Sequence, residues 1–85
     1  MKEYWRFDGM KFEGENYLQY YEFENGGVLR QINVNFFREG ISYLDIQNQD
    51  DWAEMFDQPL SDFYREAMDV MTAEEFEELW KNRKG

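Results

Sequence analysis

The sequence contains neither cysteine nor histidine, and it has one proline in 85 residues. Without cysteine, disulfide bonds, zinc–thiolate sites and thiol nucleophiles are excluded. Without histidine, the side chain that most often serves as a general base or a metal ligand is missing as well. Catalysis would have to depend on carboxylates, lysine or tyrosine. We therefore expect a protein that is not an enzyme and uses no cofactor.

Long apolar segments are also missing. The N-terminal residues MKEYWRFDG lack the apolar run of a signal peptide, and no segment approaches the roughly 18 apolar residues that a membrane helix needs. The lack of cysteine gives no indication of an oxidising compartment. We expect a cytoplasmic protein that makes no contact with a membrane.

Basic residues are scarce, with 9 Lys and Arg against 19 Asp and Glu, so the formal net charge is −10. Most of the excess negative charge lies in the second half of the chain. Residues 1–43 carry five basic and seven acidic side chains, whereas residues 44–85 carry four basic and twelve acidic side chains. An acidic surface repels phosphate, which disfavours direct nucleic-acid binding and favours a partner protein with a basic surface. The alternative is that the charge serves solubility alone.

Aromatic residues are abundant instead, with three Trp, six Tyr and eight Phe, and such large rings can build a core in a short chain. Alternation of apolar and polar residues predicts strands at about residues 2–7, 17–24, 28–37 and 41–47. Residues 1–85 are expected to form one α+β domain. Its four-stranded antiparallel meander would carry short C-terminal helices on one face.

The first hairpin is predicted from its turn sequence. Asn-Gly at 25–26 is typical of a two-residue type I′ loop, which would set Phe23 opposite Val28 and Tyr21 opposite Arg30. In this register the apolar residues of the third strand form the core face of the sheet, namely Val28, Ile32, Val34 and Phe36.

The second hairpin is predicted to turn over a three-residue loop at 38–40, with Gly40 in the left-handed region. That loop would set Val34 opposite Leu44. One residue does not fit the pattern, because Gln19 falls on the core face near Ile32.

Residues after the sheet change to helical spacing, and the helical region is expected at about 50–83. A short helix is predicted at about 50–57, ending before Pro59. Residues 67–71 could continue a helix or be extended, and extension is favoured. The sequence TAEE at 72–75 is a capping box, so the last helix begins there and should pack on the sheet through Phe76 and Trp80.

A metal site is the chemical alternative that the acidic residues allow. Five carboxylates could surround a calcium ion, yet their spacing lacks the central glycine and the final glutamate of an EF-hand loop. The five are Asp45, Asp50, Asp51, Glu54 and Asp57. A solvated acidic face is the favoured interpretation, with no metal.

The second side of the sheet is the candidate interface, because aromatic anchors within a polar rim carry much of the energy of protein contacts. Ordinary cross-strand pairing is the alternative explanation. The candidate partner-binding residues on the sheet are Tyr20, Glu22, Leu29, Phe37, Tyr43 and Asp45. Those after the sheet are Asp50, Asp51, Glu54 and Asp57.

Three segments, EYWRF, YLQYYEFENGGVLRQI and MTAEEFEELW, resemble a group of small uncharacterised bacterial proteins, some of them immunity-like. The likeness covers about half of the chain, and it implies a soluble α+β binding module whose partner stays open. We expect a monomer or a weak homodimer. The first functional hypothesis is an inhibitor or immunity-type protein that covers a basic site on a toxin, a nuclease or a defence effector. The alternatives are a phage-type anti-defence protein, such as an anti-CRISPR protein that mimics DNA, and a homo-oligomeric structural protein.

Overall fold

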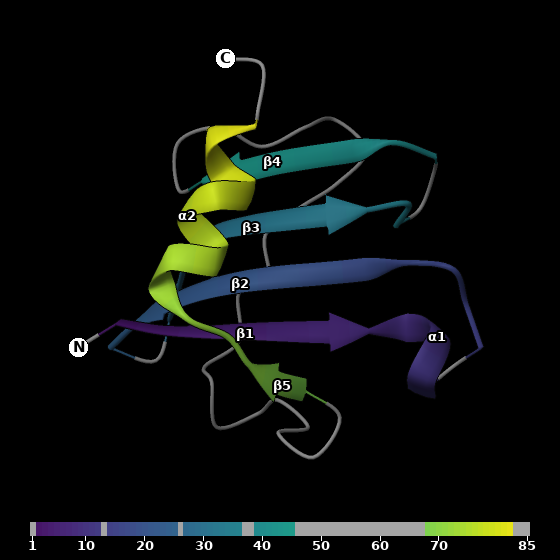
Figure 1. The fold of residues 1–85 in the computed structure, drawn as a ribbon, viewed down its shortest axis with the longest axis horizontal. Coiled ribbons are helices and arrows are strands. Elements are labelled where there is room, and N and C mark those ends of the chain that lie inside the picture. The colour runs from purple at the N-terminus through teal and green to yellow at the C-terminus, as the bar shows by residue number, and fades with distance from the viewer. Residues whose placement is uncertain (1, 13, 26, 37–38, 46–67, 83–85) are drawn as a thin grey trace.

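In the part of the chain that the structure describes, five antiparallel strands form one sheet in the order β4-β3-β2-β1-β5 (Figure 1). The computed structural model describes residues 2–12, 14–25, 27–36, 39–45 and 68–82. The strands are β1 (Lys2–Asp8), β2 (Leu18–Glu24), β3 (Gly27–Val34), β4 (Ile41–Asp45) and β5 (Met68–Val70). The helices are α1 (Gly9–Phe12) and α2 (Ala73–Lys81). The α+β class is as expected, but the sheet has five strands where the sequence predicted four.

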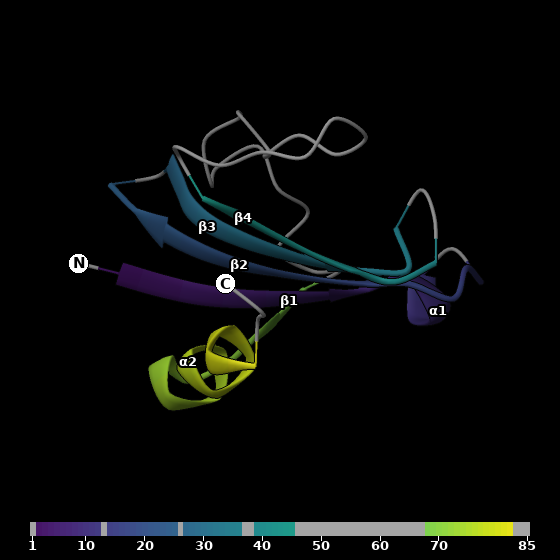
Figure 2. The same cartoon turned by 90° about the horizontal axis from the view of Figure 1, so that it is seen from above.

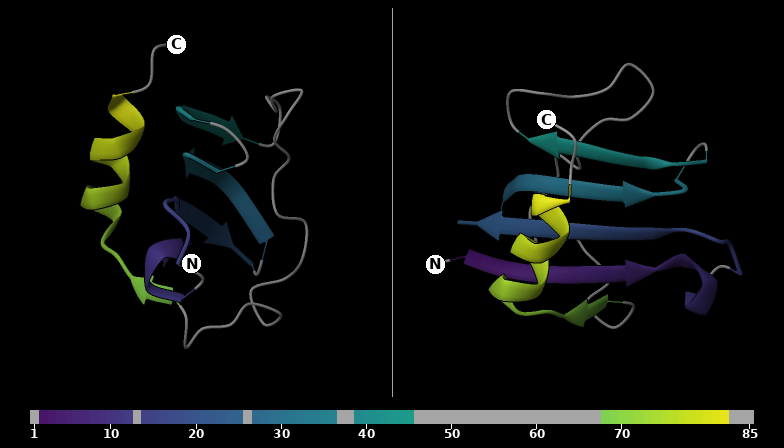
Figure 3. Two further views of the ribbon diagram at one scale, coloured as in Figure 1. Left: turned by 90° about the vertical axis from the view of Figure 1, so that its right-hand side faces the viewer. Right: turned by 45° about the horizontal axis from the view of Figure 1, so that its top comes forward.

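Helix α2 forms a second layer on one face of the sheet (Figure 2). It begins beside β1 and β5 and crosses the strands towards β4, as the tilted views show (Figure 3). The predicted capping box is present, because the Glu75 amide donates to Thr72 Oγ1 at 3.1 Å and the Thr72 amide donates to Glu75 Oε1 at 3.0 Å. Phe76 and Trp80 are the buried residues of this helix.

The β2–β3 hairpin contains a β-bulge that changes its register. Phe23 lies opposite Val28, as predicted from the Asn-Gly turn, but Glu22 lies opposite Arg30. The prediction that Tyr21 faces Arg30 was therefore wrong, because the bulge leaves Leu29 as an extra residue on β3. Every β2 residue before the bulge consequently points to the opposite face from the one predicted.

The bulge also explains the position of Gln19. In the observed register Gln19 lies opposite Asn33, not beside Ile32. Its Nε2 atom donates to Asn33 Oδ1 at 3.2 Å, and Gln31 Nε2 donates to the same oxygen at 2.9 Å. Buried amides need such partners, so the pairing of polar side chains across the strands favours this register.

The β3–β4 connection spans residues 35–40, twice the predicted length. Asn35 and Gly40 both have positive φ, 55° and 112°, and the Asn35 amide donates to the Gly40 carbonyl at 2.8 Å. Strand β3 accordingly ends at Val34, which lies opposite Ile41 instead of Leu44. Asn tolerates the left-handed conformation better than most residues, which allows the chain to turn here.

Strand β5 was predicted only as an extended stretch, and the structure places it at the edge of the sheet beside β1. Phe7 lies opposite Met68 and Trp5 opposite Val70. The Met71 amide then donates to the Tyr4 carbonyl at 3.0 Å, which holds the start of α2 against β1.

Apolar residues are buried on both faces of the sheet. The face under α2 buries Ile32 with Phe76 and Trp80, and the residues packed against them include Tyr4, Tyr20, Val34, Tyr43, Met71 and Leu79. The other face buries Tyr21, Phe23 and Met68, with Trp5, Phe7 and Val28 packed against them. The predicted core face therefore combined residues that belong to opposite sides.

The predicted helix at 50–57 lies outside the described residues. Helix α1 was not predicted, and at its start the Met10 amide donates to Asp8 Oδ1 at 3.0 Å. Neither of the two described helices is long and apolar enough to cross a membrane.

Candidate functional site

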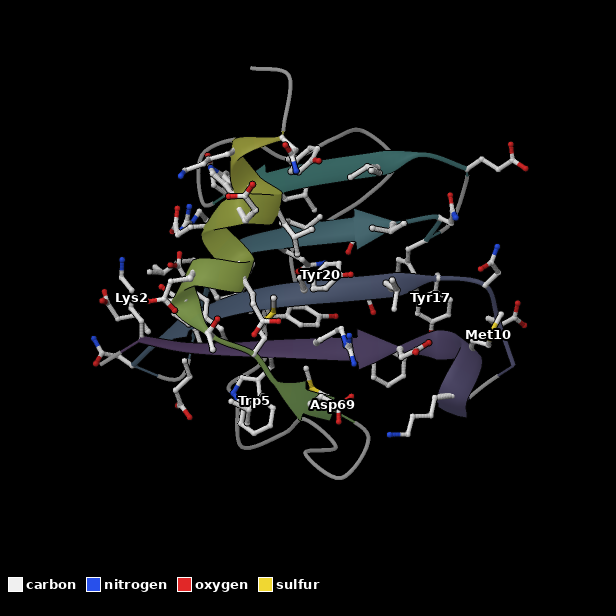
Figure 4. The ribbon with its side chains drawn as sticks, in the orientation of Figure 1. Lys2, Trp5, Met10, Tyr17, Tyr20 and Asp69 are labelled. Carbon is white, nitrogen blue, oxygen red and sulfur yellow. The ribbon has the colours of Figure 1, made fainter. Side chains whose placement is uncertain are left out.

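Helix α2 divides its face of the sheet into two flanks, with Lys2 on one side of the helix and with Tyr20 and Asp69 on the other (Figure 4). The first flank holds a set of charged and polar groups around one buried carboxylate, here called the ionic cluster: Tyr4, Glu22, Arg30 and Glu77. The second flank is a groove between α2, β1, β2 and β5, here called the acidic groove. The two flanks use similar residues in different ways.

The ionic cluster is centred on Glu22, which is 1% exposed. Arg30 binds it with two parallel hydrogen bonds, Nε to Oε1 at 2.6 Å and Nη2 to Oε2 at 2.7 Å. The Tyr4 hydroxyl donates to Oε2 at 2.8 Å. Arg30 also pairs with Glu77 of α2, so the cluster joins β1, β2, β3 and the helix. Charge-assisted bidentate pairs of this kind are among the strongest hydrogen bonds in proteins.

Aromatic rings complete the surroundings of Arg30. Its guanidinium carbon lies 5.0 Å from the centre of the Phe76 ring and 4.9 Å from that of Trp80. These distances are within the range of cation–π contacts. A single cation thus neutralises a buried carboxylate and packs against the two residues that anchor α2.

The pKa values in the cluster follow from this geometry. Burial by itself would raise the pKa of Glu22, but the hydrogen bonds from Arg30 and Tyr4 outweigh it, and the pKa is lowered. The bond to Glu22 raises the pKa of Arg30, and the bond from Arg30 lowers that of Glu77. Burial, together with the bond to Glu22, raises the pKa of Tyr4 to about 12. All four groups therefore keep their usual charge at neutral pH.

That charge state makes the cluster poorly suited to catalysis. An efficient general acid or base has a pKa near the working pH, whereas Glu22 is held ionised and Tyr4 is held protonated. Glu22 is also covered, and both of its oxygens accept hydrogen bonds. The cluster is best understood as a structural link between the sheet and α2.

The acidic groove has an apolar lining and a charged rim. The apolar lining comes from Tyr20, Val70, Met71 and Leu79. The charged residues are four carboxylates and one guanidinium, a net formal charge of −3, from Asp69, Glu74, Glu75, Glu78 and Arg6. Val70, at the sheet edge, is 72% exposed.

Two of the groove's carboxylates are already engaged. Glu75 belongs to the capping box, and its bonds with Thr72 lower its pKa. Asp69 accepts a hydrogen bond from Arg6 at 3.1 Å, in a pair whose side chains are 45% and 48% exposed. Among the described residues, no hydrogen bond or ion pair engages Glu74 or Glu78. Their carboxylates are available to a partner.

The predicted interface residues of the sheet lie largely beneath α2. Tyr20 and Tyr43 pack against the cluster of Ile32, Phe76 and Trp80, and the Tyr43 and Trp80 rings meet edge to face at 5.9 Å. The expectation that both tyrosines lie on an open face was wrong, because the bulge turns Tyr20 towards α2 and the longer loop turns Tyr43 the same way. Tyr20 still lines the acidic groove.

The remaining candidates are distributed as follows. Glu22 is buried in the ionic cluster, so it is a structural residue and not part of an open surface. Leu29 is partly buried at the bulge, and Asp45, also partly buried, lies opposite Arg30. Outside the described residues lie Phe37, Asp50, Asp51, Glu54 and Asp57. No group of described side chains forms a metal site.

Sequence reasoning missed the groove residues of α2 as a site. Among the carboxylates of the first helical turns, only those of the capping box at 72–75 received a role from the sequence. Glu74 and Glu78 are four residues apart and therefore share one side of a helix, which was a usable signal. Their proximity to Arg6 and Asp69 was not visible, because it depends on the pairing of β1 with β5.

No family model matches the chain, and neither a curated protein nor a solved structure matches it. The resemblance to small bacterial proteins stays a prediction. The function must be inferred from the chemistry of the chain itself.

Proposed function

We propose that this chain is a non-enzymatic, acidic protein-binding module of the inhibitor or immunity type. It covers a basic site on a partner protein such as a toxin, a nuclease or a defence effector. The observation that carries the proposal is that the carboxylates on α2 differ in whether the fold uses them. Glu77 is used by the fold, whereas Glu74 and Glu78 are exposed and engage no other described side chain.

The overall charge supports the same function. A net charge of −10 on 85 residues repels itself in the folded state, and a basic partner would relieve that repulsion. The chain lacks histidine and cysteine, and the buried ionisable cluster is held in fixed charge states. Both features fit a binding module better than an enzyme.

A DNA mimic is a special case of the same proposal, in which the basic partner is a nucleic-acid-binding protein. The homo-oligomer alternative relied on an open face at Tyr20 and Tyr43, and those side chains pack against α2. It has no support from the described surface. Competition by duplex DNA for the captured partner would separate a DNA mimic from other inhibitors.

The test is capture of a partner from the host lysate with the tagged full chain, followed by binding kinetics at several salt concentrations. Steering by the acidic surface should make association slower as salt rises, because the Debye length falls from about 10 Å at 0.1 M to about 3 Å at 1 M. Dissociation should change less. The first variant to compare replaces Asp50, Asp51, Glu54 and Asp57 by Asn or Gln, which keeps shape and removes charge.

The expected result is that neutralising these carboxylates slows association and flattens its dependence on salt. A captured partner whose association is independent of salt, and equally fast for the neutralised variant, would contradict the proposal. The acidity would then serve solubility alone.

A further inference from the structure

The acidic groove combines two properties that an ordinary solvated surface does not need. Its apolar lining includes Tyr20, Met71 and Leu79, and its charged residues carry a net formal charge of −3. A groove with apolar walls and a few polar groups is the usual form of a recognition site. The net charge specifies which kind of occupant is favoured.

We propose that this groove binds a basic segment of the partner protein, in which an apolar side chain enters between α2 and the sheet. Lysine or arginine side chains on either side of it pair with Glu74 and Glu78. The inference rests on the proposed function and names the part of the described surface that performs it. Peptide recognition of this kind places apolar anchors in a groove and uses charged residues for register and specificity.

Charge complementarity excludes the other occupants. A nucleic acid or another anion would meet four carboxylates and one guanidinium, and that guanidinium, on Arg6, already pairs with Asp69. A second copy of the chain carries a net charge of −10 and would be repelled. A basic segment gains favourable contacts at Glu74 and Glu78 without breaking any hydrogen bond or ion pair of the described residues.

The geometry also indicates how the groove is held open. Arg6 on β1 and Asp69 on β5 pair at 3.1 Å along one wall, and the capping box fixes the first turn of α2 along the other. Both walls are therefore formed before a partner arrives. A preformed groove lowers the entropy lost on binding.

The experiment uses the full chain and a short synthetic peptide that alternates lysine and leucine. Amide chemical shifts recorded during titration locate the peptide, and fluorescence anisotropy gives its dissociation constant. We expect the shifts to cluster at Arg6, Tyr20 and residues 69–79. The double variant Glu74→Gln with Glu78→Gln should weaken binding by about two- to thirty-fold, the range expected for two exposed ion pairs.

A matched control removes the same amount of charge elsewhere. Glu15 and Glu39 are exposed and line a separate cleft near the β3–β4 connection, so Glu15→Gln with Glu39→Gln also removes two negative charges from the chain. This control should bind the peptide within about two-fold of the parent. Equal weakening by both double variants would overturn the groove assignment, because it would show attraction to the overall charge only.

A second peptide tests the apolar lining. Replacing each leucine by serine keeps the basic charge, and this peptide should bind at least about ten-fold more weakly. Equal affinity for the two peptides would also overturn the proposal.

The groove and the general function can fail separately. A captured partner that binds the Glu74→Gln, Glu78→Gln variant as fast and as tightly as the parent would overturn the groove and leave the proposed function intact. A captured partner whose binding is independent of salt and of every carboxylate tested would overturn the function.

Discussion

Both flanks of α2 carry carboxylates, but the carboxylates of one flank are paired within the fold and two of those on the other flank are not. On the flank of the ionic cluster, Glu22 and Glu77 surround Arg30, and their charges are neutralised within the fold. On the flank of the acidic groove, Glu74 and Glu78 lie at the rim without such a partner in the described chain. The difference shows that a carboxylate's role depends on which cation the fold brings near it. The partly buried Arg30, which contacts both Glu22 and Glu77, makes the first flank structural.

The comparison also explains why the protein tolerates its acidity. Buried charges are costly unless they are paired and hydrogen-bonded, and the ionic cluster meets both conditions. Exposed carboxylates cost little individually, because water solvates them and salt screens them. An acidic chain can therefore fold stably while several of its carboxylates stay exposed.

The largest effect is expected from Trp80, which lies on the buried face of α2 and contacts both Tyr43 and Arg30. Trp80→Ala should lower the free energy of unfolding by about 3 to 5 kcal/mol, because it removes a buried aromatic ring and leaves a cavity. The measurement is a urea or thermal unfolding curve. An unchanged midpoint would mean that α2 does not cover the sheet, and both flanks would lose their definition.

The next effect tests the ionic cluster. Arg30→Met should cost about 3 kcal/mol at neutral pH, because buried Glu22 loses both hydrogen bonds from Arg30 and keeps only the more distant Lys2, at 3.8 Å, as a cation. Glu22→Leu combined with Arg30→Met should recover most of that loss, since no buried charge remains. A double variant as unstable as the single one would show that the cluster does not act through its charges.

The stability of the single variant Arg30→Met should depend on pH in a different way from that of the parent. In the parent the pKa of Glu22 is lowered, so its contribution to stability is present above the unfolded value of about 4.3 and is lost as pH falls through the folded pKa. Without Arg30, burial should raise the pKa of Glu22, and the variant gains stability as pH falls towards 4.3. The stability difference between parent and Arg30→Met should therefore shrink between about pH 7 and pH 4.5. An equal difference at both pH values would contradict this account.

The smallest effect is expected on the groove side. Glu74→Gln with Glu78→Gln should change the free energy of unfolding by no more than about 0.5 kcal/mol, because both side chains are exposed and neither has a described partner. Chemical denaturation beside Arg30→Met measures the contrast directly. A loss comparable to that of Arg30→Met would show that the groove carboxylates also support the fold.

The sequence by itself determined the features that local chemistry controls. The Asn-Gly turn correctly placed Phe23 opposite Val28, because the turn and its two flanking residues are adjacent in the chain. The capping box correctly placed the start of α2, because Thr72 and Glu75 satisfy backbone groups only three residues away. The acidic balance suggested a basic partner without any structure, and that suggestion stays a prediction.

Only the tertiary structure decided the register of β2 against β3, and therefore which residues lie on each flank of α2. The bulge at Leu29 moves Glu22 opposite Arg30 and Gln19 opposite Asn33, which pairs groups that would otherwise be buried alone. The energy that selects this register comes from partners on other strands and on α2, so no local pattern contains it. The acidic groove is decided in the same way, since Arg6 and Asp69 lie 63 residues apart in sequence and meet only because β5 pairs with β1.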